Sequence, residues 1–121
     1  MKAPRPKESD LQIGVCQWLD QAIQWRGFYF SVPNECGYKN KRLQKMGLKP
    51  GIADLVFHDM PDCKLAFVEL KRKGGDLTDA QTNYKMEMSV VGTPYEVIIS
   101  DDINYFIDVL TGLLRCWGAM K

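Results

Sequence analysis

Three charged residues, Asp54, Glu69 and Lys71, stand within two apolar stretches near the middle of the sequence. Residues 54–58 and 65–71 are typical of strands, and the Pro61-Asp62 pair between them predicts a turn. A turn centred there pairs residues whose numbers add up to 123, which sets Asp54 opposite Glu69. Opposed residues of an antiparallel pair share a face, with Cβ atoms about 4.5–5.5 Å apart. Since side chains alternate with a period of two, Lys71 is predicted on the same face.

This trio predicts a metal-dependent hydrolase. Two carboxylates held so close repel each other unless a positive charge lies between them, and their hard oxygens suit Mg²⁺ or Mn²⁺. The Lys71 ammonium could position a water, help to deprotonate it, or stabilise charge that grows on a phosphate. No cluster of Cys, Ser or His offers a covalent route. The alternative is a solvated strand face, but the opposite face of the hairpin is apolar, which indicates a central position: Leu55, Phe57, Ala66, Val68 and Leu70.

A run of cations precedes the hairpin. Five of them fall in an eleven-residue stretch that has no acid: Lys39, Lys41, Arg42, Lys45 and Lys49. Because phosphate contacts supply most of the sequence-independent affinity for nucleic acid, we interpret the run as a DNA clamp, with an ordinary solvated loop as the alternative. His58 shares the face of Asp54, but a lone strand histidine is more often structural than a ligand.

The elements that must position these residues follow from periodicity. The pattern predicts an α/β fold in the order α-β-β-β-α-β-α, with a mixed sheet flanked by helices. Helices are expected at about 10–25, from 78 to about 92 and from about 101 onward, and strands at 28–32, 54–58, 65–71 and 95–99. A loop is expected at 35–51, with room for one helical turn inside it.

Helix starts and inner faces can also be predicted. Capping boxes are expected at Ser9 with Gln12 and at Thr78 with Gln81, and Ser100 or Asp101 is expected to cap the last helix. The apolar stripes expected to face inward are Leu11, Val15, Trp18, Leu19 and Ala22 in the first helix, Ala80, Tyr84, Met88 and Val91 in the second, and Ile103, Phe106, Ile107, Leu110 and Leu114 in the third.

Length and composition limit the class of protein. The 121 residues suit a single domain spanning 1–121, with a hydrophobic fraction of 45% and a charged fraction of 26%. No apolar run is long enough for a membrane helix, and the basic N-terminus leads into no signal-peptide core. The four cysteines form no C-x-x-C pair, so we expect free thiols in a reducing cytoplasm.

The charge is divided unevenly along the chain. Residues 1–49 carry nine Lys or Arg against four Asp or Glu, whereas residues 50–121 carry seven against eleven. This division indicates an acidic centre beside a surface suited to a polyanion.

Three segments together resemble the PD-(D/E)xK nuclease superfamily and, within it, the virus-type replication-repair nuclease (VRR-NUC) family. They are Gly51-Ile52-Ala53-Asp54-Leu55, Phe67-Val68-Glu69-Leu70-Lys71 and Gly74-Gly75-Asp76-Leu77-Thr78-Asp79-Ala80-Gln81. The resemblance spans residues 8–97 and implies a restriction-endonuclease-like αβββαβ core. Two positions depart from the family pattern: Ala53 stands where proline is usual, and Asp76 stands where a basic residue is common.

The resemblance also implies roles for single residues. Asp54 and Glu69 would be metal ligands and Lys71 the catalytic lysine. Glu8 matches the family's helical glutamate, a metal ligand directly or through water, although it also suits a first-turn acid favoured by the helix dipole. Gln81 matches the family's glutamine in the site, with a purely capping role as the alternative.

Substrate and assembly are implied at a coarser level. Carrying only the nuclease core, the chain is similar to the stand-alone phage or bacterial members of the family, which cut junctions as dimers. The implied function is a structure-specific DNA endonuclease acting as a homodimer, with four-way (Holliday) junctions as the leading substrate. Nicking or restriction-like cleavage, or DNA binding without catalysis, are the alternatives.

Overall fold

The computed structural model describes residues 4–32, 41–47, 49 and 51–120. Its elements, in chain order, are α1 (Glu8–Ala22), the 3₁₀ turn η1 (Arg26–Phe28), β1 (Tyr29–Ser31), α3 (Lys41–Lys45), β2 (Leu55–Met60), β3 (Cys63–Lys71), α4 (Asp79–Val91), β4 (Tyr95–Ile99) and α5 (Ile103–Cys116). The predicted order of the main elements is therefore confirmed. The short helix α3 lies within the segment predicted as a loop.

The four strands form one mixed sheet in the order β1-β2-β3-β4. The first three are antiparallel, and β4 runs parallel to β3 because helix α4 crosses over between them. Leu55 pairs with Val68 and His58 pairs with Leu65, so the hairpin register predicted from the Pro61-Asp62 turn is confirmed.

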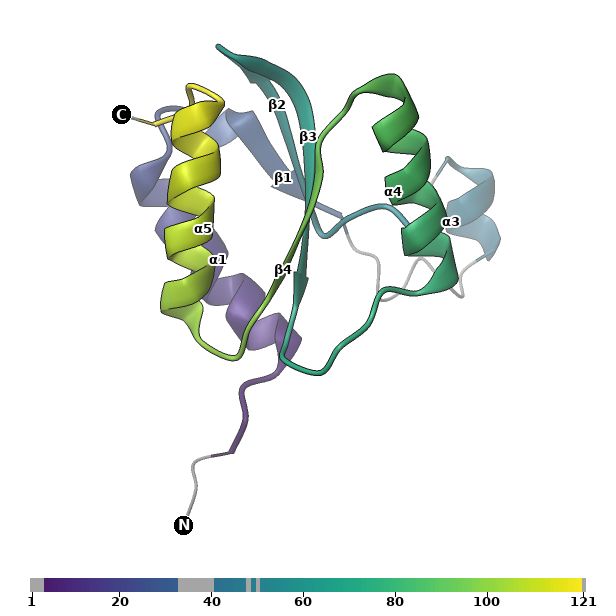
Figure 1. Ribbon diagram of the computed structural model, residues 1–121, viewed down its shortest axis with the longest axis horizontal. Coiled ribbons are helices and arrows are strands. Elements are labelled where there is room, and N and C mark those ends of the chain that lie inside the picture. Colours follow the sequence, from purple (N-terminus) through teal and green to yellow (C-terminus); the bar gives the residue numbers. More distant parts are fainter. Residues whose placement is uncertain (1–3, 33–40, 48, 50, 121) are drawn as a thin grey trace.

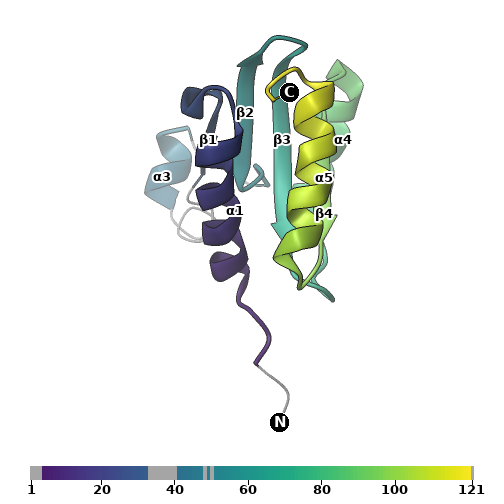
Figure 2. The ribbon, with the colours of Figure 1, turned by 90° about the vertical axis from the view of Figure 1, so that its left-hand side faces the viewer.

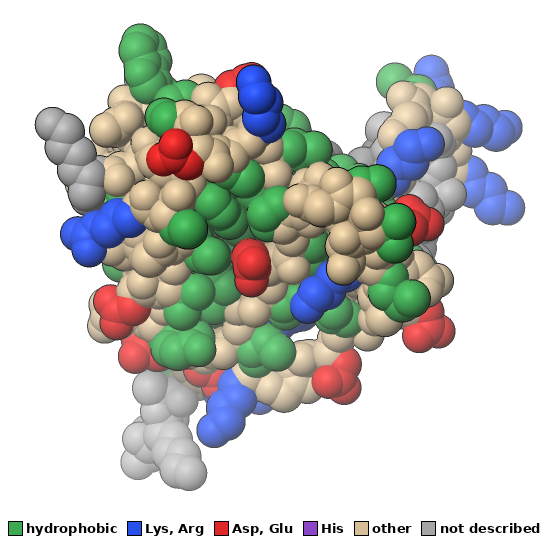
Figure 3. Space-filling model, turned by 45° about the horizontal axis from the view of Figure 1, so that its top comes forward, with side chains coloured by type: hydrophobic (Ala, Val, Ile, Leu, Met, Phe, Trp, Pro, Cys, Tyr) green, Lys and Arg blue, Asp and Glu red, His purple; other side chains and the backbone are tan. Residues whose placement is uncertain are grey.

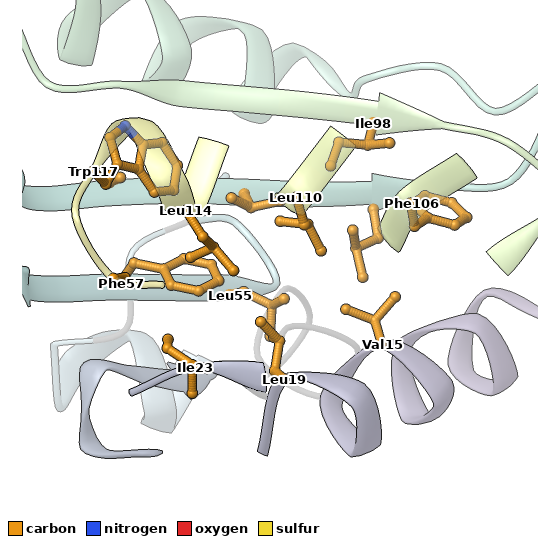
Figure 4. Packing of buried hydrophobic residues seen from close by; sticks show 14 of the residues in the cluster. Val15, Leu19, Ile23, Leu55, Phe57, Ile98, Phe106, Leu110, Leu114 and Trp117 are labelled. Atoms are coloured by element: carbon orange, nitrogen blue, oxygen red, sulfur yellow. The ribbon is translucent and has the colours of Figure 1, made fainter. Parts of the chain in front are cut away.

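Helices cover both faces of the sheet. Figures 1 and 2 show α1 and α5 against one face and α4, with α3 beyond it, on the other side. The larger core lies under α1 and α5, where Figure 4 shows Val15 and Leu19 of α1 facing Leu110 and Leu114 of α5 across the strand residue Leu55. Burial of this apolar surface holds the two helices to the sheet.

The face under α4 has a smaller core. Its buried residues are Ala53, Val56, Phe67 and Tyr95, and none of the residues of α4 is itself fully buried. Tyr84 and Met88 pack against this cluster as predicted, but Val91 is 68% exposed, so its predicted inward position is wrong. Val91 is the last residue of the helix, which is ended by Gly92 in a left-handed conformation.

Helix starts differ from the sequence prediction at two places. Helix α1 begins at Glu8, after Lys7, which makes no side-chain cap hydrogen bond, so the predicted Ser9–Gln12 capping box is wrong. Helix α5 is capped by Asp102 rather than Ser100 or Asp101, because the Asp102 carboxylate accepts from the backbone N–H of Asn104. Asp101 has another partner, described below.

Two predictions made from composition can be compared with the described residues. Cys16, Cys63 and Cys116 are free, as expected, and Cys36 lies outside the described residues. Within the described part of the chain, no helix is both long enough and apolar enough to cross a membrane.

Candidate active site

Asp54 and Glu69 lie side by side where β2 begins. The Asp54 backbone N–H donates to Glu69 Oε2 at 3.0 Å, and the Leu70 N–H donates to Asp54 Oδ2 at 3.0 Å. Each carboxylate is thus hydrogen-bonded to backbone of the other's strand region, a consequence of the hairpin register. Glu69 is only 2% exposed and is the one buried charged residue of the described chain.

The two carboxylates disfavour each other's ionised form. Burial, followed by the neighbouring Asp54, raises the pKa of Glu69 to about 8, an effect that Lys71 partly offsets. Burial also raises the pKa of Asp54, with a further contribution from Glu8. Two adjacent carboxylates that are shielded from water require a proton or a metal ion to offset their negative charge. The two carboxylates are hard oxygen donors, so the residues fit Mg²⁺ or Mn²⁺.

Lys71 supplies the positive group of the site. Its Nζ lies 3.7 Å from Glu69 Oε1, and its side chain is 12% exposed. As the last residue of β3, it is held by the sheet, and its carbonyl accepts from the Ser100 N–H at 3.0 Å. The ammonium is therefore presented beside the carboxyl pair by backbone that is paired with β4.

Gln81 caps helix α4 and also contacts Glu69. Its Oε1 accepts from the Thr78 N–H at 2.9 Å, which together with the Thr78 hydroxyl completes the capping box of α4. Its Nε2 donates to Glu69 Oε1 at 2.9 Å. Because the cap fixes the amide oxygen, the amide NH₂ is turned towards the carboxylate, and the start of α4 thereby orients Glu69.

Gly51 and Tyr95 support the site, and neither role was predicted. The Tyr95 hydroxyl donates to the Gly51 carbonyl at 3.0 Å, and its ring packs against Phe67 and Tyr84. Gly51 has φ of +84°, and a Cβ there would lie 2.2 Å from the Ala80 carbonyl oxygen. Close approach of the Gly51 backbone brings the first turn of α4 to the start of β2. The sequence indicates a glycine three residues before Asp54, but it gives no indication that Tyr95, 44 positions away, is its hydrogen-bond partner.

Glu8 opens helix α1, partly buried, and lies close enough to Asp54 to contribute to its raised pKa. It does not complete a triad: in the described part of the chain, no three His, Cys, Asp or Glu side chains are grouped so as to hold a metal ion. His58 lies apart, with Nδ1 2.8 Å from Asp59 Oδ2 and its ring against Phe30.

The described residues of the basic stretch are exposed to solvent. Lys41, Arg42, Lys45 and Lys49 are exposed, whereas Lys39 is outside the described residues. The first three belong to α3, and Figure 3 shows Lys and Arg side chains gathered on the lobe at the upper right that this helix forms. The structure thus presents them to solvent as a group.

Fold and site together define an α/β protein with a carboxylate-carboxylate-lysine centre on a mixed sheet, in which Glu69 is buried and Asp54 and Lys71 are half-buried. Among solved structures, a protein described as a "VRR_NUC domain protein" has the same fold, with a TM-score of 0.72 and 19% sequence identity over 100% of this chain and 99% of that one. The restriction-endonuclease-like fold expected from the sequence is therefore confirmed. A scan of protein-family models gives no match. A search of curated proteins gives none either.

Proposed function

We propose that this chain is a metal-dependent nuclease that hydrolyses phosphodiester bonds in DNA. The observation that carries the proposal is the buried Glu69 beside the half-buried Asp54, with the Lys71 ammonium 3.7 Å from Glu69. The likeness in fold to a VRR_NUC domain protein supports it, since the name of that protein designates a nuclease domain.

Asp54 and Glu69 would hold Mg²⁺ or Mn²⁺, with Glu8 contributing through water, since it does not group with them as a third direct ligand. The bound ion would supply Lewis-acid stabilisation of the phosphate and lower the pKa of a water molecule. Lys71 places a fixed positive charge where negative charge develops on the phosphate and can orient the attacking water. Gln81 keeps Glu69 Oε1 in place through its 2.9 Å hydrogen bond, so the ligand pair is preorganised.

DNA would be held by the exposed cations of α3, Lys41, Arg42 and Lys45, together with Lys49 and Lys39. We infer a structure-specific endonuclease that works as a homodimer, with four-way junctions as the leading substrate. Two active sites facing two strands are what symmetric cutting of a junction requires.

The test is a cleavage panel of junction, flap, nicked, duplex and single-stranded DNA, each with and without Mg²⁺ or Mn²⁺. We expect metal-dependent cutting with the junction preferred. Cutting of plain duplex at equal rates would favour a nicking or restriction-like enzyme. Salt-dependent binding with no cutting under either metal would reduce the protein to a DNA-binding module and overturn the proposal.

A further inference from the structure

Arg5 fastens the N-terminal segment to the loops that follow β3 and β4. Its Nε and Nη2 donate to the two carboxylate oxygens of Asp101 at 3.0 and 3.1 Å, and Nη2 also donates to the Lys73 carbonyl. The Lys73 N–H in turn donates to Asp101 Oδ1 at 3.0 Å. We refer to Arg5, Lys73 and Asp101 as the N-terminal clasp. Hydrogen bonding by Arg5 is the largest cause of the lowered pKa of Asp101.

Two residues of the clasp are close in sequence to residues of the candidate active site. Lys73 follows Lys71 by two residues, and Arg5 precedes Glu8 by three. Figure 1 shows the N-terminal segment at the same end of the sheet as the loops from β3 to α4 and from β4 to α5. An isolated exposed ion pair contributes little, but a bidentate arginine with added backbone hydrogen bonds has a fixed geometry.

Three exposed cations outside the α3 lobe lie on segments that the clasp joins, namely Lys7, Arg72 and Lys73. Arg72 lies near enough to Asp101 to contribute to its lowered pKa, and Lys7 lies within about 7 Å of Arg5 by chain length. The negative charge of Asp101 is paired with Arg5. Asp76 is the one acidic residue in the sequence between β3 and α4.

We propose that Lys7, Arg72 and Lys73 form a second phosphate-binding surface for DNA, held beside the active site by the N-terminal clasp. The proposal rests on the proposed function in that the phosphates are those of the strand being cut. In Figure 1 the N-terminal segment and the loop after β3 lie at the bottom of the molecule, whereas α3 lies at its right-hand side. A branched or bent DNA could contact both surfaces while one strand reaches Lys71.

Replacing Asp101 with alanine distinguishes the effect of releasing the clasp from the effect of removing a negative charge. Loss of a negative charge should by itself tighten DNA binding, whereas release of the clasp should weaken it. We expect Asp101→Ala to weaken binding on the order of fivefold, measured by fluorescence anisotropy with labelled junction DNA in EDTA. Asp108→Ala, which removes an exposed acid on α5, should leave binding unchanged or slightly tighter. Binding by Asp101→Ala as tight as wild type, or tighter, would overturn the proposal.

The triple variant Lys7→Ala, Arg72→Ala, Lys73→Ala tests the surface directly. Its binding should have a shallower salt dependence, by about 0.9 in the logarithmic slope for each phosphate that the variant no longer neutralises. The control, Lys64→Ala with Lys85→Ala, removes exposed lysines at the hairpin tip and on α4 and should leave the slope unchanged. An unaltered slope in the triple variant would refute the surface. Because binding is measured without metal, a wild type that binds DNA but never cuts it would refute the nuclease and leave this test valid.

Discussion

At the scale of the residue, Glu69 is the group of the site whose pKa is most strongly raised. Its carboxyl is buried, adjoins Asp54, and has a pKa raised to about 8 from an ordinary value of 4.5. The folded protein therefore holds this proton more tightly than the unfolded chain does. Stability from the protonated group is fully present below about pH 4.5 and is lost as the pH rises towards 8.

Metal-free protein should accordingly melt at lower temperature as the pH increases from 4.5 to 8. The loss should exceed about 1.4 kcal/mol, the free energy that corresponds to one pKa unit. Glu69→Gln keeps the shape without the charge and should flatten this dependence. Thermal melting in EDTA across the pH range measures both proteins. If the melting temperatures of wild type and variant change in parallel with pH, ionisation of Glu69 is not the cause of the pH dependence.

Gln81 and Thr78 allow capping to be separated from active-site positioning. Thr78→Ala removes one hydroxyl partner of the cap and should cost about 1 kcal/mol of stability while most activity remains, because the Thr78 N–H still holds the Gln81 amide. Gln81→Ala loses the hydrogen bond to Glu69 as well and should reduce cleavage at least tenfold. Thermal melting together with cleavage kinetics distinguishes them. Equal cleavage by the two variants would mean that Gln81 only caps α4.

At the scale of the element, the hairpin of β2 and β3 was predictable and its supports were not. Its register follows from local turn chemistry at Pro61-Asp62 and from alternation on both strands. The hydrogen bond from Tyr95 to Gly51 and the clasp from Arg5 to Asp101 join residues 44 and 96 positions apart. A single sequence offers no local signal for such partners, since they depend on how β4 and α1 pack.

Gly51 and Gly74 form a matched pair for testing how α4 is placed. Both have positive φ, +84° and +86°, so alanine at either position incurs about 1–2 kcal/mol of backbone strain. Only at Gly51 would the added Cβ also collide with backbone, the Ala80 carbonyl. Gly51→Ala should therefore be the more destabilising in urea unfolding and should impair cleavage, whereas Gly74→Ala should affect stability alone. Equal effects of the two substitutions would show that the close approach to α4 is unimportant.

At the scale of the whole molecule, the structure combines a buried acidic centre with exposed cations, as the uneven charge of the two parts of the sequence indicated. The buried side of this division was predictable from strand patterning. The course of the basic stretch was only partly predictable, because no periodic apolar pattern in the sequence marks its helical turn α3. Its distance from Asp54 depends on loop geometry that composition does not specify.

The α3 cations should contribute affinity without sequence preference. Replacing Lys41, Arg42 and Lys45 with alanine should weaken DNA binding alike for all sequences and make its salt dependence shallower. Stability should change by less than about 0.5 kcal/mol, because exposed side chains bury little surface. Anisotropy titrations at several salt concentrations measure the effect. Unchanged affinity and slope would identify α3 as an ordinary solvated helix.

Cleavage of a labelled four-way junction in Mg²⁺ or Mn²⁺ by wild type, Glu69→Gln and Lys71→Ala tests the central claim most directly. Wild type should cut. Glu69→Gln should bind metal more weakly and lose cleavage, and Lys71→Ala should lose cleavage with metal binding largely intact. Both variants should remain folded in thermal melts. Glu69→Gln removes a charge that repels Asp54, whereas Lys71→Ala removes the ammonium that partly offsets this repulsion and should melt somewhat below wild type. Wild-type cleavage by either folded variant would contradict the assignment of this site.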